Sequence, residues 1–333
     1  MNVKSMLKQI IPAEILHMYS SCKEKVVLGR EVMRDKKRYY KNAFFLARSE
    51  SEEGIKSSLI FHSHSIEKGL SHPKFRPNFG RSALGSIRLE LDKFLEADLP
   101  KDDFSFLNTL SVLKAYKKKH VELEVETPYF DNLFNLLMYK DVNEMAGTTT
   151  LQKKGQKLPE GVFEKLATMR HSIRKFSPDP VDMNTIRKAV QMAMSTPSVC
   201  NRQPWKIYVT SNSTKIKNIL QIQGGYAGYG IPPVLMVVCV DLRDFRGSYE
   251  RNEPFVDGGL FLMSLLYGLA DENMATCVLN AMLSDKNLNS IRKLMNIDSS
   301  NVLISFVIAG NYPTRYSVTK SARKPLSSVY YEV

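Results

Sequence analysis

Two clusters of polar residues between Ala167 and Lys206 have side chains and spacings suited to binding a charged, heterocyclic ligand. The first cluster is RHSIR, which places two permanent cations and a hydroxyl at residues 170–174. The guanidinium fork of arginine matches the oxygens of a phosphate, and a serine hydroxyl can add a hydrogen bond. This density of donors is suited to holding a phosphate.

The second cluster is PSVCNRQPW at residues 197–205, where Asn201 and Gln203 lie two residues apart on a chain stiffened by two prolines. Side-chain amides of this kind pair with the donor and acceptor edge of a heterocycle. A plainer interpretation stays open from the residues alone. Arg170 and Arg174 would then form a solvated i,i+4 face, and residues 201–204 an ordinary turn.

The elements around these clusters alternate between helices and strands. Asp182 is a suitable N-cap for a helix over residues 183–195. Residues 205–209, 234–240 and 302–309 have the β-branched and aromatic content of strands, and residues 254–270 form a long apolar helix. The glycine-rich loop at 224–230 lacks the GxGxxG register of a dinucleotide fingerprint. We predict an α+β fold with helices around a mixed, mainly antiparallel sheet.

Three motifs in order, RHSIRKF, TPSVCNRQPW and ARKPL, resemble the flavin-dependent nitroreductase family, over roughly residues 164–333. The resemblance implies an FMN enzyme built as a homodimer, with each flavin at the subunit interface. Arg170, Ser172 and Arg174 would hold the ribityl phosphate and the flavin pyrimidine edge, and His171 fits the same pattern. The other cofactor-binding residues that it implies are Pro197, Ser198, Asn201, Gln203, Gly310 and Arg323.

The function implied by this resemblance is FMN-dependent oxidoreduction of the nitroreductase type. A ping-pong reaction would pass hydride from NADH or NADPH through flavin N5 to a small electron-poor acceptor. The flavin carries the chemistry, so no catalytic side chain and no metal is expected. The extension resembles those of proteins encoded beside surface-polysaccharide genes, which implies a sugar-linked substrate. A non-catalytic FMN-binding interaction protein and a flavin-free basic adaptor remain alternatives.

One stretch departs from the family pattern. A Gly-Leu-Gly sequence usually follows the long helix, whereas this chain has Asn273-Met274-Ala275 at that place. Asparagine is the next best residue after glycine in a left-handed helix C-cap, so we expect Asn273 to preserve the turn.

The first 150 residues are predicted to be a mostly helical N-terminal extension, with helices at 10–19, 25–48, 82–95 and 104–120. Residues 146–157 have the composition of a linker, which predicts a boundary between an extension at 1–150 and an FMN-binding domain at 158–333. His62, His64 and Glu67 invite a metal interpretation, but two histidines two residues apart point to different sides of a helix.

Charge and cysteine content narrow the class of protein further. The net charge is +13, of which residues 151–333 carry +9, and an anionic cofactor and donor account for part of that excess. There is no zinc-finger spacing and no RNP-like sequence, so nucleic acid is not an expected partner. Four scattered cysteines predict a cytoplasmic protein with free thiols, and no apolar run reaches the length of a membrane span.

Overall fold

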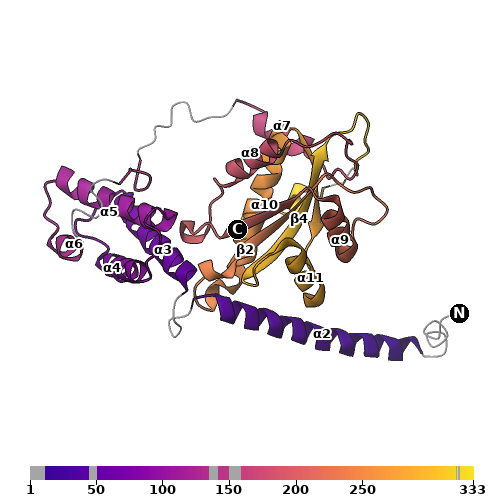
Figure 1. Ribbon diagram of the computed structural model, residues 1–333, viewed down its shortest axis with the longest axis horizontal. Coiled ribbons are helices and arrows are strands. Elements are labelled where there is room, and N and C mark those ends of the chain that lie inside the picture. The colour runs from indigo at the N-terminus through magenta and orange to yellow at the C-terminus, as the bar shows by residue number, and fades with distance from the viewer. Residues whose placement is uncertain (1–11, 45–50, 135–141, 150–158, 320, 322) are drawn as a thin grey trace.

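The computed structural model describes residues 12–44, 51–134, 142–149, 159–319, 321 and 323–333. Figure 1 shows a long projecting helix, a group of helices, and an α+β part in which helices surround a sheet. The predicted α+β class is confirmed. The predicted linker lies mostly at residues 150–158, outside the described residues, so the domain boundary stays a prediction.

The N-terminal region contains five described helices. They are α2 (Ala13–Asn42), α3 (Glu52–Leu70), α4 (Arg81–Glu96), α5 (Phe104–Glu122) and α6 (Pro128–Leu133). The two helices predicted at 10–19 and 25–48 are wrong as separate elements, because α2 runs through residues 20–24, which contain neither glycine nor proline. Residues 10–11 and 45–48 of that prediction lie outside the described residues.

Helices α3, α4 and α5 share one apolar core. Leu59 and Ile66 of α3, Ile87 of α4 and Leu113 of α5 are fully buried in it. The loop after α3 is anchored in the same core by Phe79, whose ring lies 5.1 Å from that of Tyr116. The N-terminal helices therefore have a packed interior of their own.

The C-terminal part is built on one four-stranded sheet in the order β1-β2-β4-β3. Its strands are β1 (Trp205–Thr210), β2 (Val234–Asp241), β3 (Met274–Asn280) and β4 (Asn301–Asn311). All three pairings are antiparallel, which agrees with the prediction of a mainly antiparallel sheet. All of β2 is buried, which explains its continuous run of apolar residues.

Helices cover both faces of this sheet. The helices of this part are α7 (Val162–Met169), α8 (Met183–Ala193), α9 (Ser213–Gln223), α10 (Glu253–Asp271) and α11 (Asp285–Met295). Met236 and Val238 pack with α8 and α10, whereas Val237 and Cys239 pack with α9 and α11. This alternation follows from the two-residue period of a strand. No helix among the described residues is long and apolar enough to cross a membrane.

The turn after α10 is formed by Asn273, whose φ of 55° lies in the left-handed region. The expectation that this asparagine replaces a glycine in the turn is confirmed. Met274 then begins β3 directly, and β3 is the edge strand beside which the first polar cluster lies.

Candidate functional site

The first polar cluster lies along the outer edge of β3. Ser172 forms a parallel bridge with Thr276, and the backbone N–H of Ile173 donates to the Thr276 carbonyl at 2.7 Å. Ile173 is buried, with 1% of its surface exposed. Side chains two residues apart on extended backbone share one side. Arg170, Ser172 and Arg174 therefore share the side opposite Ile173.

The charges of this cluster converge on Cys277 of β3. Burial raises the pKa of the Cys277 thiol. The positive charges of Arg174 and Arg170 oppose that rise, and so does a hydrogen bond from Ser172. Both guanidinium groups thus act on one thiol from the same edge of the sheet. Among the described residues, no carboxylate forms an ion pair with Arg170 or Arg174. The edge of β3 therefore has a local excess of positive charge.

Two cavities meet at Arg174. One, of about 890 Å³, is also lined by Lys175, Tyr229, Arg315 and Tyr316. The other, of about 790 Å³, contains Tyr226, whose hydroxyl donates to the Arg174 carbonyl at 2.6 Å. Burial raises the pKa of that hydroxyl to about 12, so it stays a donor at neutral pH. These cavities offer cations, hydroxyls and aromatic faces to a ligand.

The second polar cluster is a tight turn at residues 198–203, which contains the 3-10 helix η2 (Val199–Asn201). Cys200, Asn201 and Gln203 have φ values of 50°, 53° and 53°, all in the left-handed region. Such backbone costs about 1 kcal/mol or more per non-glycine residue and persists only where neighbouring groups enforce it. The segment is a turn, as in the plainer interpretation, and its three left-handed residues depend on neighbouring groups.

Several hydrogen bonds enforce this turn. The N–H of Gln203 donates to Ser198 Oγ at 2.9 Å, and the N–H of Val199 donates to the Asp257 carboxylate of α10 at 3.2 Å. Burial is the main reason that the pKa of Asp257 is raised to about 6. Asn201 remains exposed, and Gln203 Nε2 donates to its carbonyl at 3.2 Å. The amide of Asn201 is thus presented outward by a fixed backbone.

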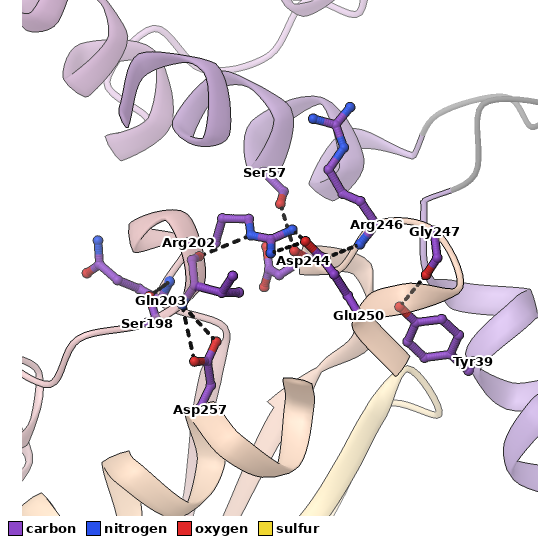
Figure 2. A network of polar contacts seen from close by, with 11 residues as sticks. Tyr39, Ser57, Ser198, Arg202, Gln203, Asp244, Arg246, Gly247, Glu250 and Asp257 are labelled. Atoms are coloured by element: carbon purple, nitrogen blue, oxygen red, sulfur yellow. Dashed lines mark hydrogen bonds and ion pairs between the residues drawn. The ribbon is translucent and has the colours of Figure 1, made fainter. Parts of the chain in front are cut away.

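Arg202 is the residue in this turn that sequence reasoning misses. Its side chain is fully buried and forms a bidentate ion pair with Glu250, at 3.0 and 2.9 Å (Figure 2). Its Nε also donates to the Val199 carbonyl at 3.2 Å. Glu250 lies 48 residues further along the chain, so the sequence around Arg202 gives no signal of this ion pair.

The two clusters lie at opposite corners of the sheet in one chain. The turn precedes β1, and Trp205 at the start of β1 pairs with Val240 of β2. Ser172 bridges Thr276 of β3, and Thr276 pairs with Ala309 of β4. Ala309 in turn pairs with Val234, at the opposite end of β2 from Val240. Four interstrand spacings separate the two clusters across the sheet, about 19 Å, and six residues separate them along it, about 20 Å. The structure thus brings each cluster together internally but does not bring the two clusters together.

The remaining predicted site residues are Gly310, His171, Pro197 and Arg323. Gly310 pairs with Ala275 inside the sheet, and a Cβ there would lie 2.8 Å from the Phe176 ring, so its smallness serves packing. His171 and Pro197 are exposed. Arg323 is exposed as well, and its described hydrogen bond goes to the Ser321 carbonyl.

The cation that the C-terminal tail brings to the cavity at Arg174 is Arg315 rather than Arg323. Arg315 and Lys175 were not singled out by their sequence context. Their positions in the sequence could have indicated them, because Lys175 directly follows Arg174 and Arg315 lies four residues after the end of β4.

The histidines of α3 do not form a metal centre with their neighbours. His64 Nδ1 lies 3.3 Å from Glu67 Oε2, and His62 packs edge-on against Phe61. Burial and the nearby Arg246 lower the pKa of His62 to about 4. Within the described ranges, no group of three His, Cys, Asp or Glu residues is arranged to hold a metal ion.

The C-terminal part thus combines a helix-flanked antiparallel sheet with a cationic segment beside its edge strand, and comparison with known proteins shows which family it resembles. The nitroreductase family model matches residues 167–225, which include both polar clusters. The resemblance seen in the motifs is confirmed, and the matching segment follows a helical N-terminal region.

Individual relatives match shorter parts. A Thermus thermophilus protein named NADH dehydrogenase is 33% identical over 93 residues, which are 28% of this chain and 45% of that protein. A Bacillus subtilis protein named FMN reductase [NAD(P)H] is 24% identical over 130 residues, 38% of this chain and 51% of that protein. The chain spans about half the length of these relatives. A Desulfovibrio desulfuricans nitroreductase crystallised with FMN aligns over 53% of this chain and 98% of its own, with 18% identity and a TM-score of 0.44.

Proposed function

We propose that this protein is an FMN-dependent NAD(P)H oxidoreductase of the nitroreductase type. The observation that carries the proposal is the pair of guanidinium groups at Arg170 and Arg174, which share one side of the β3 edge and have no carboxylate partner among the described residues. Two cations held in this way are suited to an anionic ligand. The match of the nitroreductase family model to this segment supports a flavin phosphate as that anion.

The residues present fit an FMN molecule in kind. Arg170, Ser172 and Arg174 would hold its phosphate and pyrimidine edge, while the exposed amide of Asn201 would contact its ring system with Ser198 and Gln203 behind it. FMN, when bound, would supply the redox chemistry, which is hydride transfer between NAD(P)H and a small electron-poor acceptor. The chain itself binds, orients and tunes the group. No side chain is required as an acid or nucleophile.

A homodimer is part of this proposal. The two clusters occupy opposite corners of one sheet, so a single small ligand reaches both only if the second cluster comes from another chain. Helix α10 offers a surface for that contact, because Phe255, Val256 and Leu260 are 44%, 51% and 47% exposed. An apolar helix face of this kind is typical of a subunit interface.

The names of the relatives support the nicotinamide donor, since two of them are called NADH dehydrogenase and FMN reductase [NAD(P)H]. The link to surface-polysaccharide metabolism, the extension at 1–150 and the FMN-binding domain at 158–333 stay predictions. The four cysteines are all free thiols, which supports the proposed cytoplasmic location.

The experiment that tests the proposal is an absorption spectrum of the purified protein, followed by anaerobic titration with NADH and with NADPH. We expect a yellow protein whose flavin absorbance bleaches with one donor and recovers on addition of a nitroaromatic acceptor. Bound FMN that neither donor bleaches would favour the non-catalytic alternative. A colourless protein that does not bind added FMN would contradict the proposal.

The phosphate-binding role of Arg174 is tested by Arg174→Met. Loss of one charged fork to a phosphate is expected to weaken FMN binding at least roughly tenfold, measured by quenching of flavin fluorescence. The matched control is Arg187→Met, because Arg187 is an exposed arginine of α8 that contacts only Asn184 among its described hydrogen-bond partners. Equal affinity in both variants would remove Arg174 from the site.

A further inference from the structure

One face of helix α3 is directed at the C-terminal region. Glu53 pairs with Arg243 at 3.1 Å, Ser57 Oγ donates to the Asp244 carbonyl at 3.3 Å, and the Phe61 ring lies 5.8 Å from Cζ of Arg202. The three residues are spaced by four, so they form one stripe along the helix. Helix α3 thus contacts both the 3-10 helix η3 (Leu242–Asp244) and η2, which carries the second polar cluster.

Phe61 packs against two guanidinium groups at once. Arg202 lies between the Phe61 ring and the Phe245 ring, at 5.8 and 5.5 Å, and Arg246 lies between Phe61 and Phe44, at 4.7 and 4.6 Å. Arginine stacks favourably on aromatic faces, and removal of water strengthens its ion pairs. The phenyl ring of Phe61 therefore shields the Arg202–Glu250 pair from water.

Glu250 connects its ion pair with Arg202 to the backbone of the loop at residues 244–250. Its two carboxylate oxygens accept from Arg202, and one also accepts from the backbone N–H of Arg246 at 2.6 Å (Figure 2). On the other side, Arg202 Nε fixes the carbonyl of Val199. The network thus runs from the loop at 244–250 through Arg202 into the turn that presents Asn201.

The chain around Phe44 joins the same loop from the end of α2. Phe44 forms two backbone hydrogen bonds with this loop. Its N–H donates to the Phe245 carbonyl at 2.9 Å, and its carbonyl accepts from the N–H of Gly247 at 2.8 Å. The Tyr39 hydroxyl donates to the Gly247 carbonyl at 2.8 Å. The loop is therefore bound to the N-terminal region on both sides.

We infer that Phe61 and Arg202 are positioning residues that hold the strained turn at 198–203 in the shape required for the ligand, and that helix α3 is consequently an integral part of the site. The three left-handed residues need neighbours that enforce them, and Arg202 is the buried side chain that ties the turn to α3. The part of the inference that concerns FMN rests on the proposed function.

The test uses the full-length chain and the variant Phe61→Ala. Removal of the ring is expected to speed hydrogen exchange in a peptide that spans residues 198–203, without any ligand present. The same variant is expected to bind FMN roughly tenfold more weakly, whereas Phe61→Tyr, which keeps the aromatic face, restores both properties. Tyr129→Ala is the matched control, because its ring holds Arg81 at 5.5 Å within the helical region, away from the turn.

The outcomes separate the inference from the proposed function. Unchanged exchange at 198–203 in Phe61→Ala overturns the inference, whatever the affinity for FMN. Wild-type protein that binds no FMN overturns the proposed function, and the exchange experiment still decides the positioning role. If Phe61→Ala does not fold, Arg202→Lys serves instead, since lysine keeps the charge but loses the bidentate fork. Faster hydrogen exchange confined to residues 198–203 and 244–250 in that variant supports the inference. Exchange at the wild-type rate in these residues overturns it.

Discussion

Four arginines of the described residues illustrate two different roles. Arg202 and Arg243 each have a carboxylate partner, at 2.9 and 2.6 Å, and they stabilise loops. Arg170 and Arg174 have no such partner among the described residues and lie beside cavities or the exposed edge of β3. An arginine that is already paired is poorly placed to bind a ligand anion, so the second group is the one available for function.

A prediction at the residue scale concerns Asp244. Burial raises the pKa of this carboxyl to about 7, and the nearby Asp241 adds to the rise. Because the pKa in the folded state is above its ordinary value of 3.8, the folded protein holds a proton that the unfolded chain releases between about pH 4 and pH 7. Stability associated with that proton is present at low pH and is lost as the pH rises through about 7.

The variant Asp244→Asn removes this titration. We expect it to raise the thermal unfolding midpoint by roughly 3 °C at pH 8 and by a smaller amount at pH 5, where only part of the difference between the folded and unfolded carboxyl has developed. Unfolding would be followed by far-ultraviolet circular dichroism at both pH values, with the exposed Asp102→Asn as control. A lower midpoint of Asp244→Asn at pH 8 would show that the ionised carboxylate is stabilising instead.

Sequence reasoning identifies residues whose role follows from their own type and neighbours. Arg170, Ser172 and Arg174 could be grouped because two cations and a hydroxyl within five residues are suited to holding a phosphate. Arg202 could not, because Glu250 and Phe61 approach it only in the folded chain. Its environment is set by contacts distant in sequence, and no local pattern encodes them.

At the scale of elements, Asn273 is a position where the turn sets the residue preference. Its φ of 55° strains any residue with a Cβ, and asparagine tolerates it better than most. We predict that Asn273→Ala lowers the free energy of unfolding by about 1 kcal/mol, whereas Asn273→Gly leaves it unchanged or raises it. Urea unfolding of the variants measures both effects.

The control for this prediction is an Asn→Gly substitution at a position with right-handed helical backbone. Asn287 lies within α11, where glycine costs roughly 0.5 kcal/mol or more, so Asn287→Gly should destabilise. If both Asn→Gly variants lose stability equally, the left-handed turn does not determine the preference at Asn273.

Strands were predictable where the segment is rich in β-branched and aromatic residues and harder to predict where it is not. β2 is an unbroken apolar run buried at every position, and β1 and β4 have similar β-branched content. β3 reads MATCVLN, which has little β-branched character and follows a helix almost directly. Pairing with β4, rather than local propensity, makes that segment a strand, and pairing is not visible in the sequence.

The whole-molecule prediction is that assembly and ligand binding are lost together. Leu260 is 47% exposed on the apolar face of α10, so Leu260→Lys should disrupt a dimer interface there. Because the two polar clusters lie at opposite corners of one sheet, the resulting monomer should also lose FMN binding. Light scattering after gel filtration measures the mass, and flavin fluorescence measures the binding.

Leu89→Lys is the control for this prediction, since Leu89 is 63% exposed on α4 in the helical region. It should leave both mass and FMN affinity at wild-type values. A dimer that survives Leu260→Lys would place the interface elsewhere, and a monomer that still binds FMN tightly would show that one chain supplies a complete site.

The attachment of both α2 and α3 to the loop at 244–250 has a practical consequence for anyone who wishes to express a shorter protein. Cutting at residue 159 would retain the whole sheet and every residue that the family model matches. It would also strip Phe61 and Phe44 from two arginines and open the backbone of residues 245–247 to solvent. Such a fragment would keep the matched segment but leave the loop at 244–250 and the turn at 198–203 without the contacts that support them.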